Sequence, residues 1–378
     1  MMAAGEIVNK GNGSLKDNWS GCKNILCIRA DNMGDLLMSS PAIAAVKETI
    51  GCKITVLTSS SAAGVARLIP DIDDVIVARL PWVGAGPDCG PGEMQKLIAL
   101  LKERQFDGCI IFNVYSQQTL ATAMLAYLAD IPLRLAYCRE NPYHLLSEWF
   151  PDPEPYFYID HQVKRDLNLV RLIGADTEDE SLRLSINPSV RDELCAKLKA
   201  MGIDPARPVI IMHAGVSEEK RRYPEELWIA TGKQLLSVIP EVQLLLTGSA
   251  GEEGQALEIA NGIGERAFAV AGIFSLEEFA TLINVAEIII SVNTGTIHLA
   301  AALKKPVVVL YAQTNPQHSP WMTEHELLEY SVPTELQSRN QVIRFVNEKY
   351  YPGTTAPPAP QDVVESVKEL LFPVHSVR

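Results

Sequence analysis

The feature that most constrains this chain is a regular alternation of short apolar segments with longer helical ones. Residues 24–29 (NILCIR) form an apolar run, a polar turn then opens a helical stretch, and residues 53–59 (KITVLTS) form a second, β-branched run. Strand, helix and strand within about 35 residues make a βαβ unit, which builds a parallel sheet. The first half of the chain is therefore predicted to be an α/β domain.

The second half repeats this alternation with longer apolar runs. Examples are RPVIIMHAG at 207–215, EIIISV at 287–292 and KPVVVLY at 305–311, with amphipathic helical segments between them. A chain of 378 residues is too long for one core when a domain takes about 100–200 residues. We therefore expect two α/β domains with parallel sheets, at 23–185 and 186–355.

Both ends of the chain differ from this pattern. Residues 1–22 are polar, rich in Gly, Asn, Ser and Lys, and show no periodicity, so they are predicted to be a flexible leader. Residues 356–378 hold a last amphipathic helix (QDVVESVKELLF) and a tail. We expect this helix to pack back on the first domain.

Charge and cysteine usage narrow the partners. The formal net charge of -13 repels phosphate backbones and anionic lipid, which argues against nucleic acid as a partner. The seven cysteines occur singly, without a metal-ligand spacing, so reduced and mostly buried thiols are expected. No signal peptide or membrane span is recognisable, which predicts a cytoplasmic protein with, at most, peripheral contact to the inner face of the membrane.

One loop places a carboxylate where ligands of parallel sheets bind, at the carboxyl end of a strand. In RADNMGDLL, Gly34 permits a tight turn and Asp35 falls in the first turn of the following helix. An acidic residue favours a helix N-terminus for electrostatic reasons alone, and the same dipole would keep a catalytic base ionised. Asp35 is thus either a helix-start carboxylate or a general base.

A second loop, SVNTGTIHLAAAL, has the features of an anion site. Thr294, Gly295 and Thr296 offer backbone N–H groups and hydroxyls at a helix start, and His298 follows one turn later. The alternative is a Thr-capped helix whose histidine packs under the domain interface. The basic cluster Lys220, Arg221 and Arg222 poses a similar choice, between a diphosphate site and a solvated helix start.

Other acidic residues are interpreted as structural. Asp71, Asp73 and Asp74 imitate an Asp-x-Asp metal motif but run directly into a strand, so no metal is expected there. Glu252, in TGSAGEE after another strand, could face a cleft, but the interpretation preferred here is a surface carboxylate.

Taken together, the two loops resemble glycosyltransferase family 9, the ADP-heptose:lipopolysaccharide heptosyltransferases and their relatives. The resemblance covers roughly residues 24–372, and it carries the family's catalytic aspartate onto Asp35 through ILCIRADNMGDLLMSSPAI. The family's phosphate-binding basic residue falls in KRRYP, on Arg221 or, as the alternative, Lys220. NTGTIHLAA carries donor-diphosphate binding onto Thr294, Gly295, Thr296 and His298.

The resemblance implies fold, reaction and partners. The fold would be GT-B, two Rossmann-like domains facing across a cleft, with the acceptor bound mainly by the first and the donor by the second. The reaction would be inverting transfer of a sugar from a nucleotide diphosphate sugar, such as ADP-heptose, to a glycan, lipid-linked sugar or lipopolysaccharide-core acceptor, without a metal or other cofactor. Asn293 stands where heptosyltransferases usually have Asp, which leaves the donor sugar open.

Two rival functions fit the same fold. One is a nucleotide-sugar epimerase or hydrolase, which would bind the donor similarly but need no sugar acceptor. The other is a non-catalytic, two-lobed sugar-binding protein, for which Asp35 would be only a helix-start residue.

Overall fold

The structure, a computed structural model, describes residues 15–84 and 90–373, and within them it contains two six-stranded parallel sheets. The first sheet consists of β1 Asn24–Arg29, β2 Lys53–Thr58, β3 Asp74–Val77, β4 Gly108–Ile111, β5 Leu133–Cys138 and β6 Glu148–Pro151. The second consists of β7 Val209–His213, β8 Gln243–Thr247, β9 Ala267–Ala269, β10 Ile288–Val292, β11 Val307–Ala312 and β12 His325–Tyr330. The predicted α/β class is confirmed.

Both sheets have the same topology. The strand orders are β3-β2-β1-β4-β5-β6 and β9-β8-β7-β10-β11-β12. In each sheet the first strand pairs in parallel with the second and the fourth, so the order reverses between β1 and β4 and between β7 and β10. Ligands of open parallel sheets bind at such reversal points, beyond the carboxyl ends of the strands.

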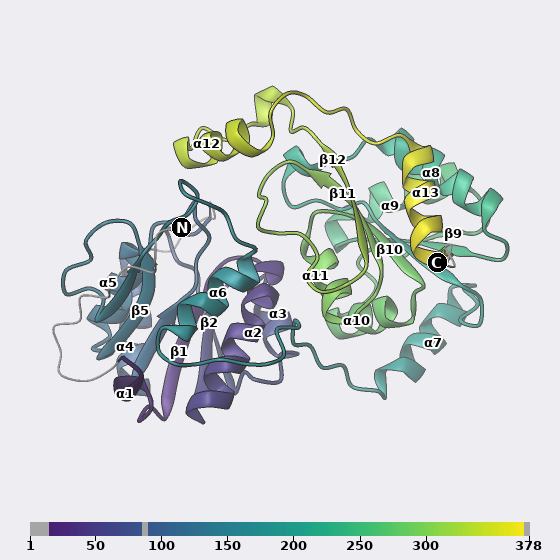
Figure 1. Cartoon of the computed structure of the whole chain (residues 1–378). Helices are drawn as coiled ribbons and strands as arrows, with labels where there is room; N and C mark the ends of the chain where they lie inside the picture. The colour runs from purple at the N-terminus through teal and green to yellow at the C-terminus, as the bar shows by residue number, and fades with distance from the viewer. Residues whose placement is uncertain (1–14, 85–89, 374–378) are drawn as a thin grey trace, which may run out of the picture.

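Helices cover the sheets and meet between them (Figure 1). Those of the first half are α1 Leu15–Trp19, α2 Met33–Ile50, α3 Ala63–Ala66, α4 Pro91–Arg104, α5 Leu120–Leu128 and α6 Gln162–Arg171. Those of the second half are α7 Val190–Ala200, α8 Glu225–Val238, α9 Glu253–Ile263, α10 Leu276–Val285, α11 Gly295–Ala302, α12 Gln341–Tyr350 and α13 Pro360–Leu371. Short 3-10 turns occur at η1 Glu219–Arg221, η2 Ala250–Glu252 and η3 Thr334–Leu336.

Two helices hold the halves together. α2 packs against α11, and one apolar cluster of fully buried side chains runs from Leu36 and Leu37 on α2 to Ile297 and Leu299 on α11. α2 is sequestered between its own sheet, α6 and α11, which explains why its residues from Leu36 to Val46 are almost all apolar or small. The carboxyl ends of β1 and β10, which precede these helices, therefore meet at the interface.

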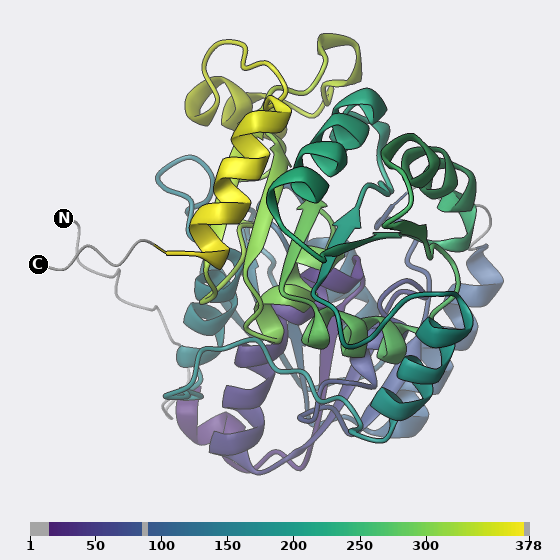
Figure 2. The same ribbon diagram turned by 90° about the vertical axis from the view of Figure 1, so that its right-hand side faces the viewer.

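The position predicted for the C-terminal helix is wrong. α13 packs on α8 of the second half, where Val363 and Val367 are fully buried in the same cluster as Trp228 (Figure 2). The amphipathic pattern requires that the valines be buried, but it does not specify which apolar surface buries them. In the folded chain that surface belongs to α8. Instead α12 reaches the first domain, where Phe345 lies against Tyr156 with ring centroids 5.1 Å apart.

The predicted flexible leader is too long. Trp19 on α1 is fully buried, and its ring lies against Gly108 of β4 so closely that a Cβ there would be 2.5 Å from it. Residues 15–22 therefore belong to the first domain, because burial of a tryptophan favours an ordered segment. The rest of the predicted leader lies outside the described residues.

Several smaller expectations can be compared directly with the structure. Asp73 pairs with Lys47 at 2.7 Å and Asp74 with Arg104 at 2.6 Å, as a polar strand approach requires. The six described cysteines are free and five are buried, while Cys89 lies outside the described residues. We propose that the domain boundary lies near residue 185, between α6 and α7, because α7 packs on α10.

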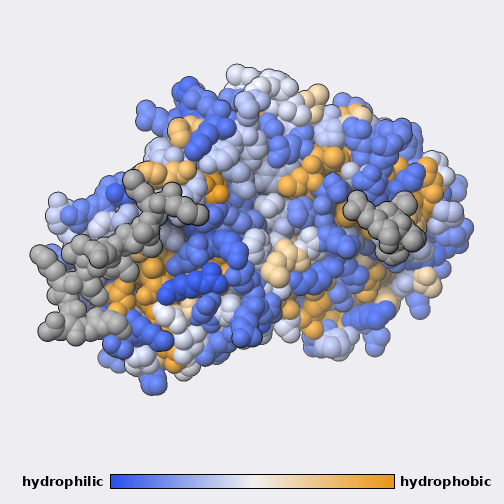
Figure 3. Space-filling view, viewed as in Figure 1, coloured by the Kyte–Doolittle hydropathy of each residue, from blue (hydrophilic) through white to orange (hydrophobic). Residues whose placement is uncertain are grey.

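The hydropathy of the surface and the character of the helices indicate whether a described segment could cross a membrane. On the face shown in Figure 3, hydrophilic residues predominate and hydrophobic ones form small groups between them. Among the helices that the structure describes, none combines the length and apolar character that crossing a bilayer needs.

Candidate active site

The first half contributes Asp35 from the start of α2. Its carboxylate accepts the Asn32 backbone N–H at 3.2 Å, which caps the helix, and it pairs with Arg29 at 3.1 Å. Arg29 is fully buried at the end of β1 and also pairs with Asp31 at 3.0 Å. A buried guanidinium requires such anionic partners, so β1 and α2 fix the Asp35 carboxylate in place.

Asp31 and Asp35, which both pair with Arg29, have pKa values shifted in opposite directions. Burial alone would raise the pKa of Asp35, but the Arg29 guanidinium and the Asn32 N–H favour the charged form, and the pKa is lowered. Burial outweighs Arg29 at Asp31 and raises the pKa of that carboxyl to about 6. Both carboxyls are therefore mostly ionised at pH 7, and Asp35 stays ionised to a lower pH than Asp31 does.

Two neutral imidazoles surround Asp35. His318, from the loop between β11 and β12, places Nε2 3.6 Å from the carboxylate of Asp35. Burial lowers the pKa of His318 to about 4 and that of His298 to about 3. Both are therefore uncharged at pH 7, and the positive charge beside Asp35 comes from Arg29.

The second half contributes the start of α11. Thr294 is the N-cap in extended backbone, no acidic residue lies in the first turn, and Gly295 and Thr296 begin the helix. The first N–H groups of a helix have no partners within it and carry partial positive charge. This turn can hold an anion.

The two helix starts touch through their glycines. A Cβ on Gly34 would lie 2.6 Å from Cδ2 of His298 and 3.4 Å from the Cα of Gly295. A Cβ on Gly295 would lie 2.5 Å from the terminal methyl of Met33. The absence of side chains at both positions lets the two helix starts approach this closely.

The basic cluster lies next to this contact. Arg221 donates to the backbone oxygen of Asn293 at 2.8 Å and pairs with Glu218 at 2.7 Å, while Lys220 pairs with the other oxygen of Glu218 at 2.8 Å. Arg222 pairs only with Glu219. Arg221 is therefore the residue of the cluster that reaches the α11 turn, and Lys220 lies beside it.

A small cavity of about 60 Å³ between the halves gathers most of the predicted residues. Asp35, Arg221, Thr294, Gly295 and His298 all line it. Lys220 lines a neighbouring cavity of about 270 Å³ that also includes Asp35, and Thr296 lines a third of about 550 Å³. The arrangement places a carboxylate, a guanidinium and a helix start around one cavity.

The third cavity combines polar groups with an apolar wall. It extends from the α11 turn across the ends of β7 and β8, and Phe274, Leu276 and Phe279 give it an apolar wall. Glu252 also lines it and accepts from the backbone N–H and the hydroxyl of Ser249, at 2.6 and 2.9 Å. Glu252 is half-buried and faces this cavity, so the structure favours the cleft-facing alternative over a plain surface carboxylate. The Ser-x-x-Glu spacing after a strand was the available signal.

Arg29, Glu218 and His318 are the other site residues that the sequence reading missed. Arg29 ends a buried strand, and a charged residue there is a signal that an anion lies nearby. No local pattern marks His318, which lies about 280 residues from Asp35 and meets it only in the folded chain.

The fold defines a class: two Rossmann-like domains in the GT-B arrangement, which is the fold of many nucleotide-sugar glycosyltransferases, with the starts of α2 and α11 meeting between them. The model of glycosyltransferase family 9 (heptosyltransferase) matches residues 94–347. The chain therefore belongs to glycosyltransferase family 9.

Individual relatives agree in length and fold. Lipooligosaccharide heptosyltransferase 2 of Haemophilus influenzae is 25% identical over 362 residues, covering 92% of this chain and 99% of the relative. A family 9 glycosyltransferase from Veillonella parvula has a TM-score of 0.74 at 16% identity, covering 92% of this chain and 97% of that one. Escherichia coli ADP-heptose lipopolysaccharide heptosyltransferase II has a TM-score of 0.69 at 21% identity, covering 92% and 98%. These two structural matches establish the GT-B fold.

Proposed function

We propose that this glycosyltransferase inverts the anomeric centre of its donor without a metal, and that heptose is the sugar to test first. The observation that carries the proposal is the meeting of an ionised Asp35, Arg221 and the α11 turn around one cavity. The E. coli relative is named for ADP-heptose and lipopolysaccharide, and these two define the first assay.

The donor would lie across the second domain. Its base would enter the apolar wall of Phe274, Leu276 and Phe279, and Glu252 would accept hydrogen bonds from ribose hydroxyls. The diphosphate would then reach the N–H groups of Gly295 and Thr296. This order puts the leaving group next to Arg221.

The acceptor would approach from the first domain. Its hydroxyl would lie against Asp35, and beyond it a cavity of about 620 Å³, lined by first-domain residues that include Arg79, Leu80 and Lys96, could hold further sugars of the glycan. Asp35 would take the hydroxyl proton as that oxygen forms a bond to the anomeric carbon.

The bond from the anomeric carbon to the diphosphate breaks in the same step, and its electron pair leaves with the diphosphate. Arg221, with Lys220 beside it, and the α11 turn would stabilise the charge that develops there. His298 is too strongly desolvated to be a cation at neutral pH, so it would contribute as a neutral hydrogen-bonding group.

The test is transfer from radiolabelled ADP-heptose, and from a panel of other nucleotide sugars, with and without a heptose-deficient lipopolysaccharide core. Label should move to the acceptor only when both substrates are present. Release or isomerisation of the sugar without acceptor would favour a hydrolase or epimerase. Binding without any turnover would favour a sugar-binding protein and contradict the proposal.

A further inference from the structure

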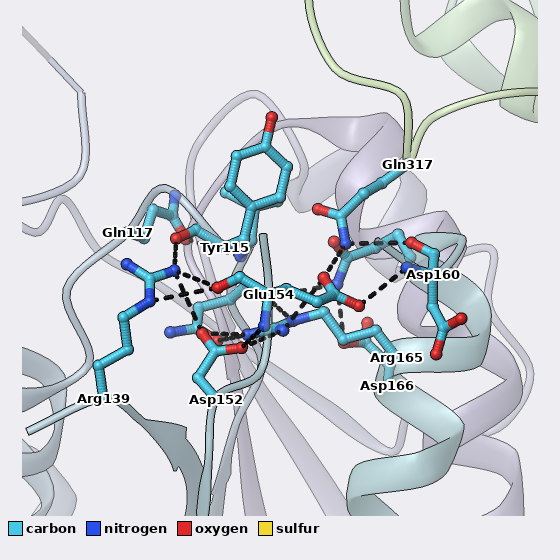
Figure 4. A network of polar contacts seen from close by, with 12 residues as sticks. Tyr115, Gln117, Arg139, Asp152, Glu154, Asp160, Arg165, Asp166 and Gln317 are labelled. Carbon is cyan, nitrogen blue, oxygen red and sulfur yellow. Dashed lines mark hydrogen bonds and ion pairs between the residues drawn. The ribbon is translucent and has the colours of Figure 1, made fainter. Parts of the chain in front are cut away.

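A loop of the second domain is anchored inside the first domain through Gln317. This residue lies between β11 and β12 and is fully buried. Its side-chain amide donates to Glu154 Oε2 at 2.5 Å and to the backbone oxygen of Asp160 at 3.2 Å, and its backbone oxygen accepts from the Gln162 N–H at 3.1 Å (Figure 4). All three partners belong to the first domain.

The receiving side is a rigid network of buried charges. Arg165, on α6, is 2% exposed and pairs with Asp152 at 2.7 Å and with Glu154 at 3.2 Å. Asp152 also pairs with Arg139. Buried charges that are satisfied in this way are strongly destabilised when one member moves. Gln317 therefore binds to a surface whose geometry is already fixed.

The anchor determines where the next residue lies. The Gln317 backbone N–H donates to Asn315 Oδ1 at 3.0 Å, which turns the Asn315 amide so that Nδ2 lies 3.2 Å from His318 Nε2. On the other side, His161 accepts the Val163 N–H at Nδ1, so its Nε2 carries the hydrogen and donates to Ser319 O at 2.9 Å. Both neighbours of His318 in the chain are thus fastened to the first domain.

We propose that Gln317 is a positioning residue for transfer: its burial in the first domain holds the β11–β12 loop so that His318 lies against Asp35. The inference rests on the proposed role of Asp35 as the base. The contacts of Gln317 with Glu154, Asp160 and Gln162 are called the clasp. When the clasp is formed, the neutral imidazole of His318 covers one side of the Asp35 carboxylate, which excludes water and fixes the orientation of the carboxylate. Loss of the clasp separates the loop of the donor domain from the base of the acceptor domain.

The first experiment needs no substrate: the imidazole of His318 is titrated by NMR in the wild type and in Gln317→Ala. The protein has seven histidines, and the signal is assigned from its absence in His318→Asn. In the wild type, burial keeps the pKa of His318 near 4, with Asp35, Arg29 and Arg221 as the charged groups facing it. Release of the loop should bring its pKa back toward about 6.5.

Gln243→Ala is the matched control. Gln243 is another buried glutamine, with its amide bonded to Asp204 at 2.8 Å, and it lies on β8 away from the clasp. Both variants should lower the melting temperature, but only Gln317→Ala should change the His318 titration. An unchanged titration in folded Gln317→Ala would overturn the clasp.

The second experiment is a kinetic double-mutant cycle with Gln317→Ala, His318→Asn and the double variant. Gln317→Ala should lower kcat by about 10- to 100-fold with little change in donor affinity, because misplacement affects the reaction more than binding. If Gln317 acts through His318, it should add almost nothing in the His318→Asn background. Multiplicative losses would contradict the positioning role.

The two proposals fail differently. Full activity of Asp35→Asn would refute the proposed function but leave the NMR result on the clasp intact. An inactive Asp35→Asn together with an unmoved His318 titration in Gln317→Ala would refute only the clasp.

Discussion

The starts of α2 and α11 meet at the centre of the molecule. They differ in whether an acidic side chain lies in the first turn of the helix. α2 begins after Asn32, whose own N–H is accepted by the carboxylate of Asp35. α11 begins after Thr294, with no acidic residue in its first turn. The same strand, turn and helix therefore give a negatively charged helix start in one half and a partially positive one in the other.

Under the proposed function, this difference would place the donor diphosphate at the start of α11 and the acceptor hydroxyl at Asp35. An anion would be repelled by Asp35 at the start of α2 but attracted by the N–H groups at the start of α11. The close approach of Gly34 and Gly295 places the negatively charged start of α2 beside the partially positive start of α11. A base and an anion site in contact are what transfer from a diphosphate sugar requires, and the following variants test each half of the comparison.

Asp35→Asn should have the largest effect. The amide keeps the shape of the side chain but cannot accept the proton, so kcat should fall by about 100- to 10,000-fold while donor affinity is preserved. The matched control is Asp362→Asn, because Asp362 caps α13 in the same way, with its carboxylate 3.1 Å from the Ala359 N–H. Equal activity of the two variants would leave Asp35 as a helix cap only.

Arg221→Ala should weaken donor binding and slow turnover, by about 10- to 100-fold in kcat/KM, because a charge-assisted contact to the diphosphate is lost. Lys220→Ala should have a smaller effect. Arg222→Ala should have none, since that residue pairs with Glu219 outside the cavities. A reversed order of Arg221 and Lys220 in steady-state kinetics would make Lys220 the phosphate ligand.

Gly34→Ala should destabilise the contact between the helix starts by about 1–3 kcal/mol, measured by thermal unfolding, because the new methyl would meet the buried His298 ring. Gly295→Ala should be milder. Its methyl meets the end of Met33, which is a flexible side chain. Equal stability of both variants and the wild type would mean that the two helix starts separate easily.

Glu218→Gln should increase donor affinity by about two- to fivefold. Glu218 holds both Lys220 and Arg221, so the diphosphate must compete with it for the same cations. Glu219→Gln, beside Arg222, is the control and should bind the donor as the wild type does. Isothermal titration with ADP-heptose measures the difference, and weaker binding to Glu218→Gln would show that Glu218 supports the site.

Chelation should have the smallest effect. Transfer is expected to continue in excess EDTA, because Arg221 and the α11 turn are proposed to neutralise the leaving diphosphate. A metal-dependent enzyme would lose nearly all its rate, since a divalent ion contributes several kcal/mol to such a transition state. Inhibition by EDTA that magnesium or manganese reverses would contradict the mechanism.

The helices, the strands and the turns at Asp35 and Thr294 follow from local patterns in the sequence. The period of the apolar residues predicts strands and helices directly, and parallel βαβ units follow from their order. Gly34 with Asp35, and Thr294 with Gly295, are local motifs at strand ends, so their place at the carboxyl edge follows from the same pattern.

Which distant segments meet depends on the folded chain and has no local signal in the sequence. The pattern of an amphipathic helix such as α13 indicates that it needs an apolar partner, but it does not identify the partner. In the structure the valines of α13 pack on α8. Trp19 likewise reaches Gly108 through a contact that no period predicts. The same holds for the anchoring of Gln317 at Glu154 and the approach of His318 to Asp35. Such contacts join residues more than 80 positions apart, and their energy depends on packing and charge complementarity that exist only in the folded chain.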